Sequence, residues 1–451
     1  MSSFVKKGMV LGAAVMTLGS LVAGCGAATN NTQQAADNKN ANNTAATGNG
    51  PVDFSKASGS IVWAAPPITN NGLRKTLVDT FNKEHPNIKV TLQNQNTNTD
   101  TNRASLTTAI GGGATTPDVY MGDVVWPAQF AHSQLAMPLD KVLPADFWNR
   151  FANGLVDGAK YQGKVYAAPF FADTAFLFYR KDLLDKAGLP VPTSWEQVQK
   201  DAQTLQNKGL VKFGYVWQGA SYEGLTCDFT EILADAGGKV LDSSGKPALD
   251  SPEAKKALSF MRGLITSKVS PAAEDTFKEP ESMNVFNNGD AAFLRNWSYA
   301  WTSSQNPKDS KVVGKVGVTV LPTFGGGAGY SSVGGWDLFV NPHTKNVPAT
   351  LAFIDWMTGK EAQTIMAKQF SEIPTNKDVQ NDPNVKKVSP IFNIVSQTKF
   401  VSRPSQNPNY AQISQALYTN VNQALSGGIS VDDALKKAQQ AIQSSASSGG
   451  L

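Results

Sequence analysis

Apolar and polar positions alternate with two different periods along the chain, and together they predict strands interleaved with helices. Short apolar or alternating runs predict early strands at Ile61–Ala65, Ile88–Leu92 and Asp118–Met121. Helical spacing follows the first strand up to Pro86, and a second helix runs from about Arg103 to the glycines at 111–113. This alternation predicts a largely parallel sheet with helices on both faces.

The same pattern continues through the second half of the chain. Further strands are predicted at Val165–Pro169, Thr174–Tyr179, Phe213–Val216, Val316–Leu321 and Val333–Val340. Thr193 and Glu196 resemble a capping box, and Ser251 precedes a helix with an apolar face between Ala254 and Leu264. Roughly 390 residues follow Ser58, which is too many for one hydrophobic core and predicts two lobes.

The N-terminal segment carries a targeting signal. Lys6 and Lys7 precede an apolar run, and Val22-Ala23-Gly24-Cys25 follows it. This layout resembles a bacterial lipoprotein signal, with residues 1–24 removed and Cys25 lipidated. The apolar run is shorter than the about 20 residues of a membrane-spanning helix. An ordinary signal peptide with a chance cysteine is the alternative.

Residues 25–58 are predicted to be the lipidated cysteine and a flexible linker. The segment is rich in Asn, Thr, Gln, Ala and Gly, and such a composition buries too little apolar surface to offset its ordering entropy. We therefore expect an extracytoplasmic protein that is anchored to the cell membrane through its N-terminal lipid only.

Composition narrows the possible functions. The 451 residues include 40 basic and 36 acidic residues and no long basic run, so charge gives no reason to expect a nucleic-acid partner. With lipid on Cys25, the second cysteine, Cys227, has no disulfide partner and is expected to be a buried small hydrophobe. The three histidines are scattered, and no phosphate-binding loop is present. We expect no metal and no cofactor.

Aromatic and acidic residues recur at loop-like positions after the predicted strands. They include Asp123, Trp126, Asp173, Tyr222, Glu223, Trp297, Tyr299, Trp301, Trp336 and Asp337. Ligands collect at the carboxyl ends of strands in open α/β sheets. Carboxylates accept hydrogen bonds from hydroxyls, and aromatic faces cover the C–H face of a pyranose, so this mixture indicates a sugar.

Some residues of these types are assigned to other roles. Trp63 and Trp356 are expected in the core, and Arg103 and Arg295 in structural ion pairs. Gly335 beside Trp336 is expected to permit close approach of a ligand.

Seven segments, taken in order, resemble a known family. They are Asp118–Trp126, Ala168–Asp173, Phe178–Leu184, Trp217–Leu225, Leu294–Trp301, Gly334–Trp336 and Arg403–Pro404. From about Ser60 to Ile442 the chain resembles the extracellular solute-binding proteins of sugar ABC importers, and it is most similar to their trehalose/maltose-binding type. The resemblance implies a two-lobed α/β fold of the type II periplasmic-binding-protein kind, with a hinge and an interlobe cleft. The expected lobes are 59–167 with 315–370, and 168–314 with 371–451.

The resemblance also implies a set of sugar contacts. The matching positions are Asp123, Asp173, Trp297, Tyr299, Gly335, Trp336 and Arg403, with Arg103 and Thr97 near a polar contact loop. Glu223 is added from its place beside Tyr222. Two departures leave the sugar open: an acidic residue expected after the first strand is missing around Thr69 and Asn70, and a tyrosine is replaced by Phe171.

The leading hypothesis is a monomeric, non-enzymatic receptor that binds a disaccharide or short α-glucoside and delivers it to an ABC permease. One alternative is a secreted glycoside hydrolase that uses carboxylates such as Asp173 and Glu223. Another is a receptor for a polyol, a monosaccharide or a larger maltodextrin. A surface scaffold is disfavoured because the sequence has no internal repeat.

Overall fold

The computed structural model describes residues 50–67 and 71–447. The predicted signal, Cys25 and most of the predicted linker lie outside the described residues, as do Thr69 and Asn70. The described part falls within one compact unit of the chain, residues 43–451. Two main sheets organise it, and each forms one lobe with the helices that cover it.

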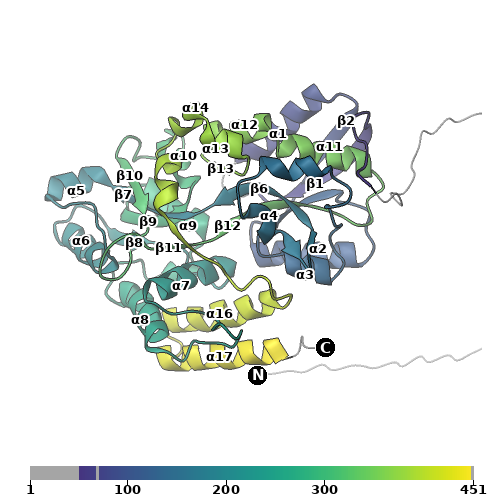
Figure 1. Cartoon of the computed structure of the whole chain (residues 1–451). Helices are drawn as coiled ribbons and strands as arrows, with labels where there is room; N and C mark the ends of the chain where they lie inside the picture. The colour runs from purple at the N-terminus through teal and green to yellow at the C-terminus, as the bar shows by residue number, and fades with distance from the viewer. Residues whose placement is uncertain (1–49, 68–70, 448–451) are drawn as a thin grey trace, which may run out of the picture. The chain divides into compact units, whose positions relative to one another are not determined.

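The first sheet has six strands in the order β13-β6-β12-β3-β1-β2 (Figure 1). Their bounds are β1 Gly59–Ala65, β2 Ile88–Asn94, β3 Val119–Asp123, β6 Ala167–Asp173, β12 Gly334–Val340 and β13 Ile373–Pro374. β1 pairs in parallel with β2 and β3, whereas β12 runs antiparallel to β3 and β6. Leu338 and Phe339 are neighbours on β12, and they enter the cores on opposite faces of this sheet.

Helices cover both faces of the first sheet. One face carries α1 (Asn71–Glu84), α11 (Val347–Met357) and α12 (Lys360–Phe370). The other carries α2 (Thr99–Gly111) and α3 (Pro127–His132). The remaining elements of this stretch are α4 (Leu155–Gly158), a 3-10 turn (Ala145–Arg150) and the short pair β4 (Lys160–Tyr161) and β5 (Lys164–Val165).

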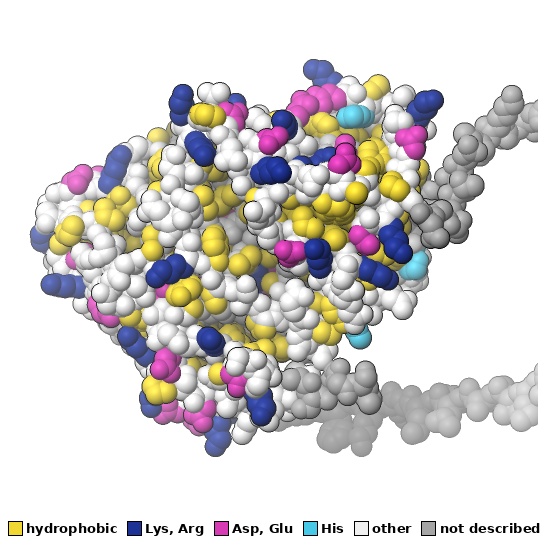
Figure 2. Space-filling model, in the orientation of Figure 1, with side chains coloured by type: hydrophobic (Ala, Val, Ile, Leu, Met, Phe, Trp, Pro, Cys, Tyr) yellow, Lys and Arg dark blue, Asp and Glu magenta, His cyan; other side chains and the backbone are white. Residues whose placement is uncertain are grey.

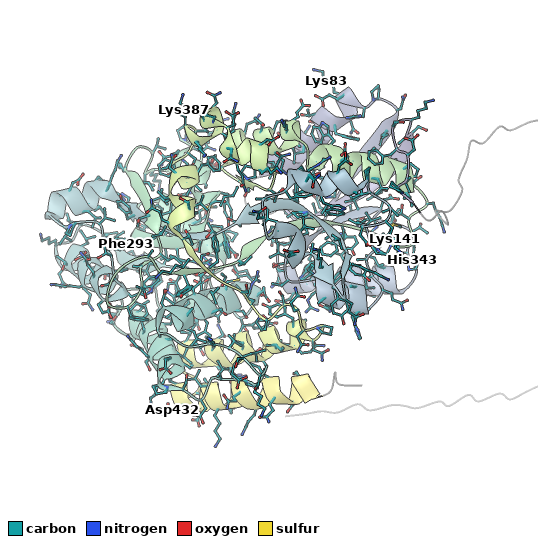
Figure 3. All side chains as sticks on the ribbon, in the orientation of Figure 1. Lys83, Lys141, Phe293, His343, Lys387 and Asp432 are labelled. Atoms are coloured by element: carbon teal, nitrogen blue, oxygen red, sulfur yellow. The ribbon has the colours of Figure 1, made fainter. Side chains whose placement is uncertain are left out.

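The second sheet has four strands in the order β10-β7-β9-β8, with β7 antiparallel to β9 and β10. Their bounds are β7 Ala175–Arg180, β8 Phe213–Val216, β9 Ala291–Trp297 and β10 Val316–Val320. Phe293 of β9, labelled in Figure 3, is buried in the larger core of this lobe. Its neighbour Leu294 belongs to the core on the other face.

Long helices enclose the larger core of the second lobe. They are α6 (Trp195–Asn207), α7 (Glu223–Asp235), α8 (Pro252–Thr266), α16 (Tyr410–Leu425) and α17 (Val431–Ser447). α16 and α17 lie side by side next to α7 and α8 (Figure 1). The remaining elements are α5 (Lys181–Ala187), α9 (Glu279–Asn287), α10 (Ala300–Gln305), α13 (Lys377–Asn381), α14 (Pro383–Lys386), α15 (Ile391–Ile394), β11 (Tyr330–Ser332), β14 (Lys399–Val401) and the 3-10 turns Glu274–Thr276 and Val395–Gln397.

Three connections join the two lobes. Thr174 alone separates β6 from β7, and Val333 alone separates β11 from β12. The third connection follows β13 of the first sheet and runs through α13, α14 and α15 to β14. β14 pairs in parallel with β11. Ser331 Oγ accepts a hydrogen bond of 2.8 Å from the backbone N–H of Ala175, which ties the first two connections together.

The sheet pairing corrects the predicted lobe boundaries at 168, 315 and 371. β6 and β13 belong to the first sheet, and β10 belongs to the second. The expectation of largely parallel sheets is also wrong, because the strands that cross between lobes return antiparallel to their neighbours. A hydrophobic run predicts a strand, but it carries little information about which strand it pairs with.

Helix starts depend on local capping, which the sequence predicts in part. Ser251 accepts a hydrogen bond from a backbone N–H at the start of α8, as expected, and Ser430 does the same at the start of α17. The cap of α6 is shifted by one residue from the predicted pair, because Ser194 accepts the N–H of Gln197 and Gln197 accepts that of Thr193. α2 begins before Arg103, because Asn98 caps it by accepting the N–H of Thr101.

Two negative findings apply to residues 50–67 and 71–447. None of their helices has the length and apolar character needed to cross a membrane. They also contain no cluster of three or more His, Cys, Asp or Glu side chains that is suited to hold a metal ion. Figure 2 shows basic and acidic side chains interspersed over the visible face.

Candidate ligand-binding cavity

A cavity lies at the crossing strands and is lined by residues of both lobes. It contains about 770 Å³ of space between atoms, its open mouth included. Its lining residues are Pro67, Thr97, Thr99, Asp123, Asp173, Tyr222, Glu223, Gly224, Cys227, Glu279, Pro280, Met283, Trp297, Tyr299, Gly334, Gly335, Trp336 and Arg403. Nine of the ten predicted contact residues are therefore in one place.

Arg103 is the predicted residue that does not line the cavity. It lies on α2, and its guanidinium is 3.5 Å from Asp100. Asp100 in turn accepts a hydrogen bond of 3.2 Å from the backbone N–H of Glu223, the first residue of α7. The two residues therefore form part of a contact between the lobes at the N-terminus of α7, where a carboxylate is favourable.

Arg403 and Glu223 line the cavity, and they bind each other and further groups of the protein. Arg403 Nη1 donates to Glu223 Oε1 at 2.6 Å, and Nη2 donates to the carbonyl of Val333 at 2.9 Å and to Asp123 at 3.3 Å. Glu223 also accepts from the hydroxyls of Tyr410 and Ser414. This cluster joins Asp123 of the first lobe to Glu223 of the second. Arg403 Nε has no hydrogen-bond partner among the described residues, so the guanidinium keeps one free donor, and the expected contacts of Arg403 and Glu223 with a solute stay predictions.

Asp123 retains one free carboxylate oxygen. Oδ1 accepts from Arg403 and from the backbone N–H of Val125, whereas Oδ2 has no hydrogen-bond partner among the described residues. Burial raises the pKa of Asp123 to about 6, although the charge of Arg403 opposes that rise. The unpartnered oxygen is suited to accept a ligand hydroxyl.

Asp173 is the second carboxylate with a free oxygen. Its Oδ1 accepts from the N–H of Thr174, the N–H of Ser298 and the hydroxyl of Ser298, all at 2.9–3.0 Å. These bonds hold the end of β6 against the residue that follows β9. Burial raises the pKa of Asp173 to about 7, even though the bonds from Ser298 lower it. Oδ2 has no partner within residues 50–67 and 71–447, so Asp173 has a second acceptor for a hydroxyl.

Two tryptophans provide apolar walls from opposite lobes. Trp336 of β12 is 8% exposed and packs edge-on against Trp126, with ring centroids 6.3 Å apart. Trp297 ends β9 and is half-buried. Tyr299 is buried with its hydroxyl unpartnered among the described residues, and burial raises its pKa so that the hydroxyl remains a donor.

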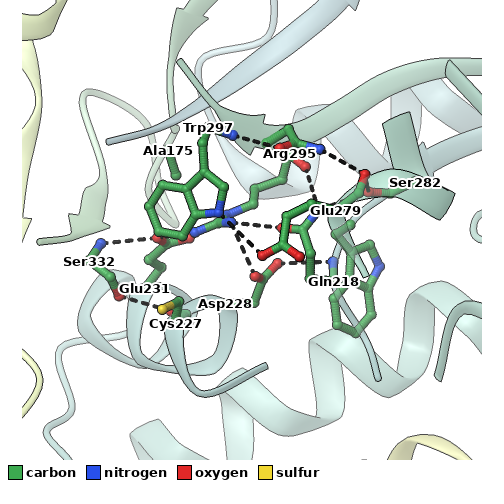
Figure 4. Close-up of polar contacts among 12 residues, drawn as sticks. Ala175, Gln218, Cys227, Asp228, Glu231, Glu279, Ser282, Arg295, Trp297 and Ser332 are labelled. Atoms are coloured by element: carbon green, nitrogen blue, oxygen red, sulfur yellow. Dashed lines mark hydrogen bonds and ion pairs between the residues drawn. The ribbon is translucent and has the colours of Figure 1, made fainter. Parts of the chain in front are cut away.

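Arg295 packs its guanidinium against one face of the Trp297 ring (Figure 4). Its guanidinium lies 4.1 Å from the centroid of the Trp297 ring. It donates to both oxygens of Glu231 at 2.5 and 3.0 Å and to Gln218 at 2.7 Å, and it lies 3.4 Å from Asp228. The expected structural role of Arg295 is confirmed, as is the burial of Trp63.

The glycines before Trp336 make room for protein atoms. A Cβ on Gly334 would come within 2.8 Å of the Trp297 ring, and a Cβ on Gly335 would come within 2.5 Å of the Phe171 carbonyl. Gly335 also has a φ of +130°, which other residues rarely adopt. The packing of the protein therefore already requires glycine at both positions. Gly335 also lines the cavity, and the expected close approach of a ligand there stays a prediction.

Several lining residues were not among the predicted contacts. Glu279, Pro280 and Met283 come from α9, and no motif or spacing in the sequence connects that helix with Trp297. Cys227 is buried with its pKa raised by burial, as expected for a small hydrophobe, and it also reaches the cavity wall. Tyr222 could have been included on the same grounds as Glu223, because it precedes it directly.

A two-lobed α/β protein with crossing strands and a cavity between its lobes has the architecture of a solute receptor. Residues 64–364 match the family described as bacterial extracellular solute-binding protein. The chain belongs to this family.

Individual relatives agree with this assignment. The "Probable ABC transporter-binding protein" of Deinococcus radiodurans is 37% identical over 72% of this chain and 79% of the relative. The mannitol-binding protein of Pseudomonas aeruginosa is 26% identical over 66% of this chain and 73% of the relative. The structure of maltose-bound MalE3 of T. maritima is similar with a TM-score of 0.79 and 33% identity, over 85% of this chain and 99% of that one. The two-lobed fold expected from the sequence is confirmed.

Proposed function

We propose that the protein is the solute receptor of an ABC importer and binds a neutral polyhydroxylated solute between its lobes. A disaccharide or short α-glucoside is the first candidate, and a polyol is the second. The observation that carries the proposal is the pairing of two indole rings with two buried carboxylates, Asp123 and Asp173, that each keep a free oxygen. Family membership and the maltose- and mannitol-binding relatives support it.

The charge of the cavity favours a neutral solute. Four carboxylates line it, whereas its one lining cation, among the described residues, is Arg403. That guanidinium already pairs with Asp123 and Glu223, so little positive charge is left for an anion. A phosphorylated or carboxylated solute would meet uncompensated repulsion in a poorly solvated site.

The receptor is proposed to work by closure of the two lobes around the solute. Thr174 alone separates β6 from β7, and Val333 alone separates β11 from β12, so a small change in their backbone angles would rotate one lobe against the other. The closed form would then present both lobes to the permease. We retain the proposals that Cys25 carries the lipid anchor, that residues 1–24 are removed and that the protein is a monomer.

A hydrolase is disfavoured by the state of Glu223. Glycoside hydrolysis requires two carboxyl groups that are free to exchange protons or attack the sugar. Both oxygens of Glu223 are occupied, by Arg403 and Tyr410 at one and Ser414 at the other. We therefore expect maltose and trehalose to be recovered intact after long incubation with the pure protein.

Calorimetric titration tests the proposed function. Maltose, trehalose, glucose and mannitol are titrated into the protein, with glucose 6-phosphate as the anionic control. We expect at least one neutral solute to bind with one-to-one stoichiometry and the phosphate to give no binding heat. Absence of binding by every neutral solute, or preferred binding of the phosphate, would overturn the proposal.

A further inference from the structure

The strongest feature not used by the predicted contacts is Glu279, at the start of α9. Its Oε2 accepts a hydrogen bond of 2.6 Å from the hydroxyl of Tyr222. Its Oε1 accepts a weaker one of 3.4 Å from Nε1 of Trp297, as Figure 4 shows for the second pair. Its backbone carbonyl accepts from the Asn296 side chain at 3.3 Å, so α9 is tied to the end of β9.

These contacts hold the Trp297 ring in one orientation. Arg295 covers one face of the ring at 4.1 Å, and Gly334 lies against its six-membered edge. Glu279 holds the nitrogen edge. The face opposite Arg295 is therefore the one left for a ligand, and Glu279 stands at the rim of that face.

The Glu279 carboxylate has capacity left after these bonds. An ionised carboxylate offers about four lone-pair positions, and the two protein donors use two of them. Tyr222 is a reliable donor here, because burial and the nearby Glu279 charge raise the pKa of its hydroxyl well above the usual value. A sugar ring that lies on an aromatic face directs its hydroxyls outward around the rim. One of them would meet Glu279.

We propose that Glu279 determines specificity by accepting one hydroxyl of the sugar ring that stacks on Trp297, while it holds the indole in place. This inference rests on the proposed function. It adds a third acidic contact on the second lobe, separate from Asp123 and Asp173. It also gives the tryptophan platform a preference for one hydroxyl, which a flat apolar face alone does not provide.

A thermodynamic cycle tests this role. The variants are Glu279→Ala and Glu279→Gln, and the probes are maltose and its monodeoxy derivatives, or trehalose and its derivatives if trehalose binds more tightly. We expect Glu279→Ala to weaken parent-sugar binding about 10- to 100-fold, as for a hydrogen bond to a charged group. One deoxy derivative lacks the hydroxyl that Glu279 is proposed to accept. For that derivative the same substitution should change affinity less than about twofold, because the hydrogen bond is already absent. Glu279→Gln keeps an acceptor and should fall between the parent and Glu279→Ala.

The control is Glu281→Gln, two residues along the same helix. Glu281 is exposed and accepts the backbone N–H of Lys278, and glutamine retains that acceptor. It removes the same charge from α9 without touching the cavity, so we expect affinity within about twofold of the parent. If Glu279→Ala does not fold, the cycle is run with Glu279→Gln alone.

The outcomes separate this inference from the function it rests on. Equal losses in the Glu279 variants for the parent sugar and all deoxy derivatives would mean that Glu279 only positions Trp297, and the inference fails. No loss at all would overturn it as well. If the unsubstituted protein binds none of the sugars, the proposed function fails instead.

Discussion

Two buried arginines with similar partners have different consequences in this protein. Arg295 and Arg403 are each almost fully buried, and each pairs with two carboxylates. All partners of Arg295 lie in the second lobe, beneath Trp297. Arg403 instead joins Asp123 of the first lobe to Glu223 of the second. The same chemistry therefore stabilises one lobe in the first case and couples the two lobes in the second.

The difference follows from where each carboxylate lies in the fold. Glu231 and Asp228 are on α7, which packs within the same lobe as β9, so the Arg295 cluster persists whatever the lobes do. Asp123 ends a strand of the first sheet, so opening the lobes would separate it from Glu223. We therefore expect substitutions in the two clusters to affect different quantities.

The largest effect is expected for Arg295→Met, on stability. Removal of the guanidinium would leave Glu231 and Asp228 buried without a cation, which costs about 3–5 kcal/mol. The free energy of unfolding from urea denaturation measures this loss. The double variant Arg295→Met/Glu231→Gln is the control, because it removes one of the unpaired charges and should recover part of the loss. A single variant as stable as the parent would contradict the structural role.

Asp337 shows what happens to a buried carboxylate without an arginine. Burial, with the charge of Asp123, raises its pKa to about 8, and no ion pair to it exists among the described residues. Asp in the unfolded chain is ionised above about pH 4, whereas folded Asp337 stays protonated up to about pH 8. The free energy of unfolding therefore falls as pH rises from about 4 towards 8. The slope is about 1.4 kcal/mol per pH unit, so the loss from pH 6 to pH 8 is about 2–3 kcal/mol.

Denaturation at pH 6 and pH 8 checks this dependence. Asp337→Asn has no proton to lose, so its stability should fall less over that range than that of the parent. Other buried carboxyls with raised pKa values, such as Asp235 at about 7, contribute in the same direction and remain in the variant. A parent whose stability rises from pH 6 to 8 would refute the assignment.

Arg403→Met is expected to change affinity without changing selectivity. Removing the guanidinium would leave Asp123 and Glu223 facing each other and disfavour the closed form, so every bound sugar should lose the same factor, about 10- to 100-fold. Titration of each accepted sugar into parent and variant gives the ratios of their dissociation constants. Ratios that shift from sugar to sugar would instead show that Arg403 contacts the solute directly, as the sequence resemblance implies.

Solute binding should weaken as the solution becomes more acidic. A hydroxyl donated to Asp173 or Asp123 favours the ionised carboxylate, whereas the pKa values of about 7 and 6 favour the protonated form below those pH values. We expect about tenfold weaker binding at pH 5.5 than at pH 7.5. Isothermal titration at both pH values tests this, and Asp173→Asn should reduce the pH dependence. A parent that binds more tightly at pH 5.5 would contradict it.

The smallest effect is expected for Asp100→Ala, at the other contact between the lobes. Its hydrogen bond to the N-terminus of α7 is partly exposed, and such an interaction contributes about 0.5–1 kcal/mol. All sugars should bind about two- to fivefold more weakly, mainly through faster dissociation. Arg103→Gln is the comparison, since it removes the charge beside Asp100 but not the bond to α7. An unchanged dissociation rate would show that this contact does not support closure.

Much of the fold could be predicted because the relevant signals are local. The strand at Phe213–Val216 has the bounds predicted from its apolar run. Ala254 and Leu264 are both buried on one face of α8, as their spacing indicates. Asp123, Asp173 and Trp297 each end a strand, as their predicted positions indicate, and they line one cavity; Trp336 joins them from inside β12, near its start.

The sequence by itself determined which segments become strands and helices, and which side chains collect where strands end. Hydrophobic period, caps and turns are read within a few residues, so one chain is enough to recognise them. The sequence by itself could not decide which carboxylates stay available to a solute, because their availability depends on hydrogen-bond and ion-pair partners far away in the chain. Glu223 is 180 residues from Arg403, and Glu279 is 57 residues from Tyr222.

Only the tertiary structure showed that both oxygens of Glu223 have protein donors, that Asp173 keeps a free oxygen and that Glu279 stands beside Trp297. Hydrogen bonds and ion pairs act over a few ångströms, and the folded chain alone brings such distant residues within that range.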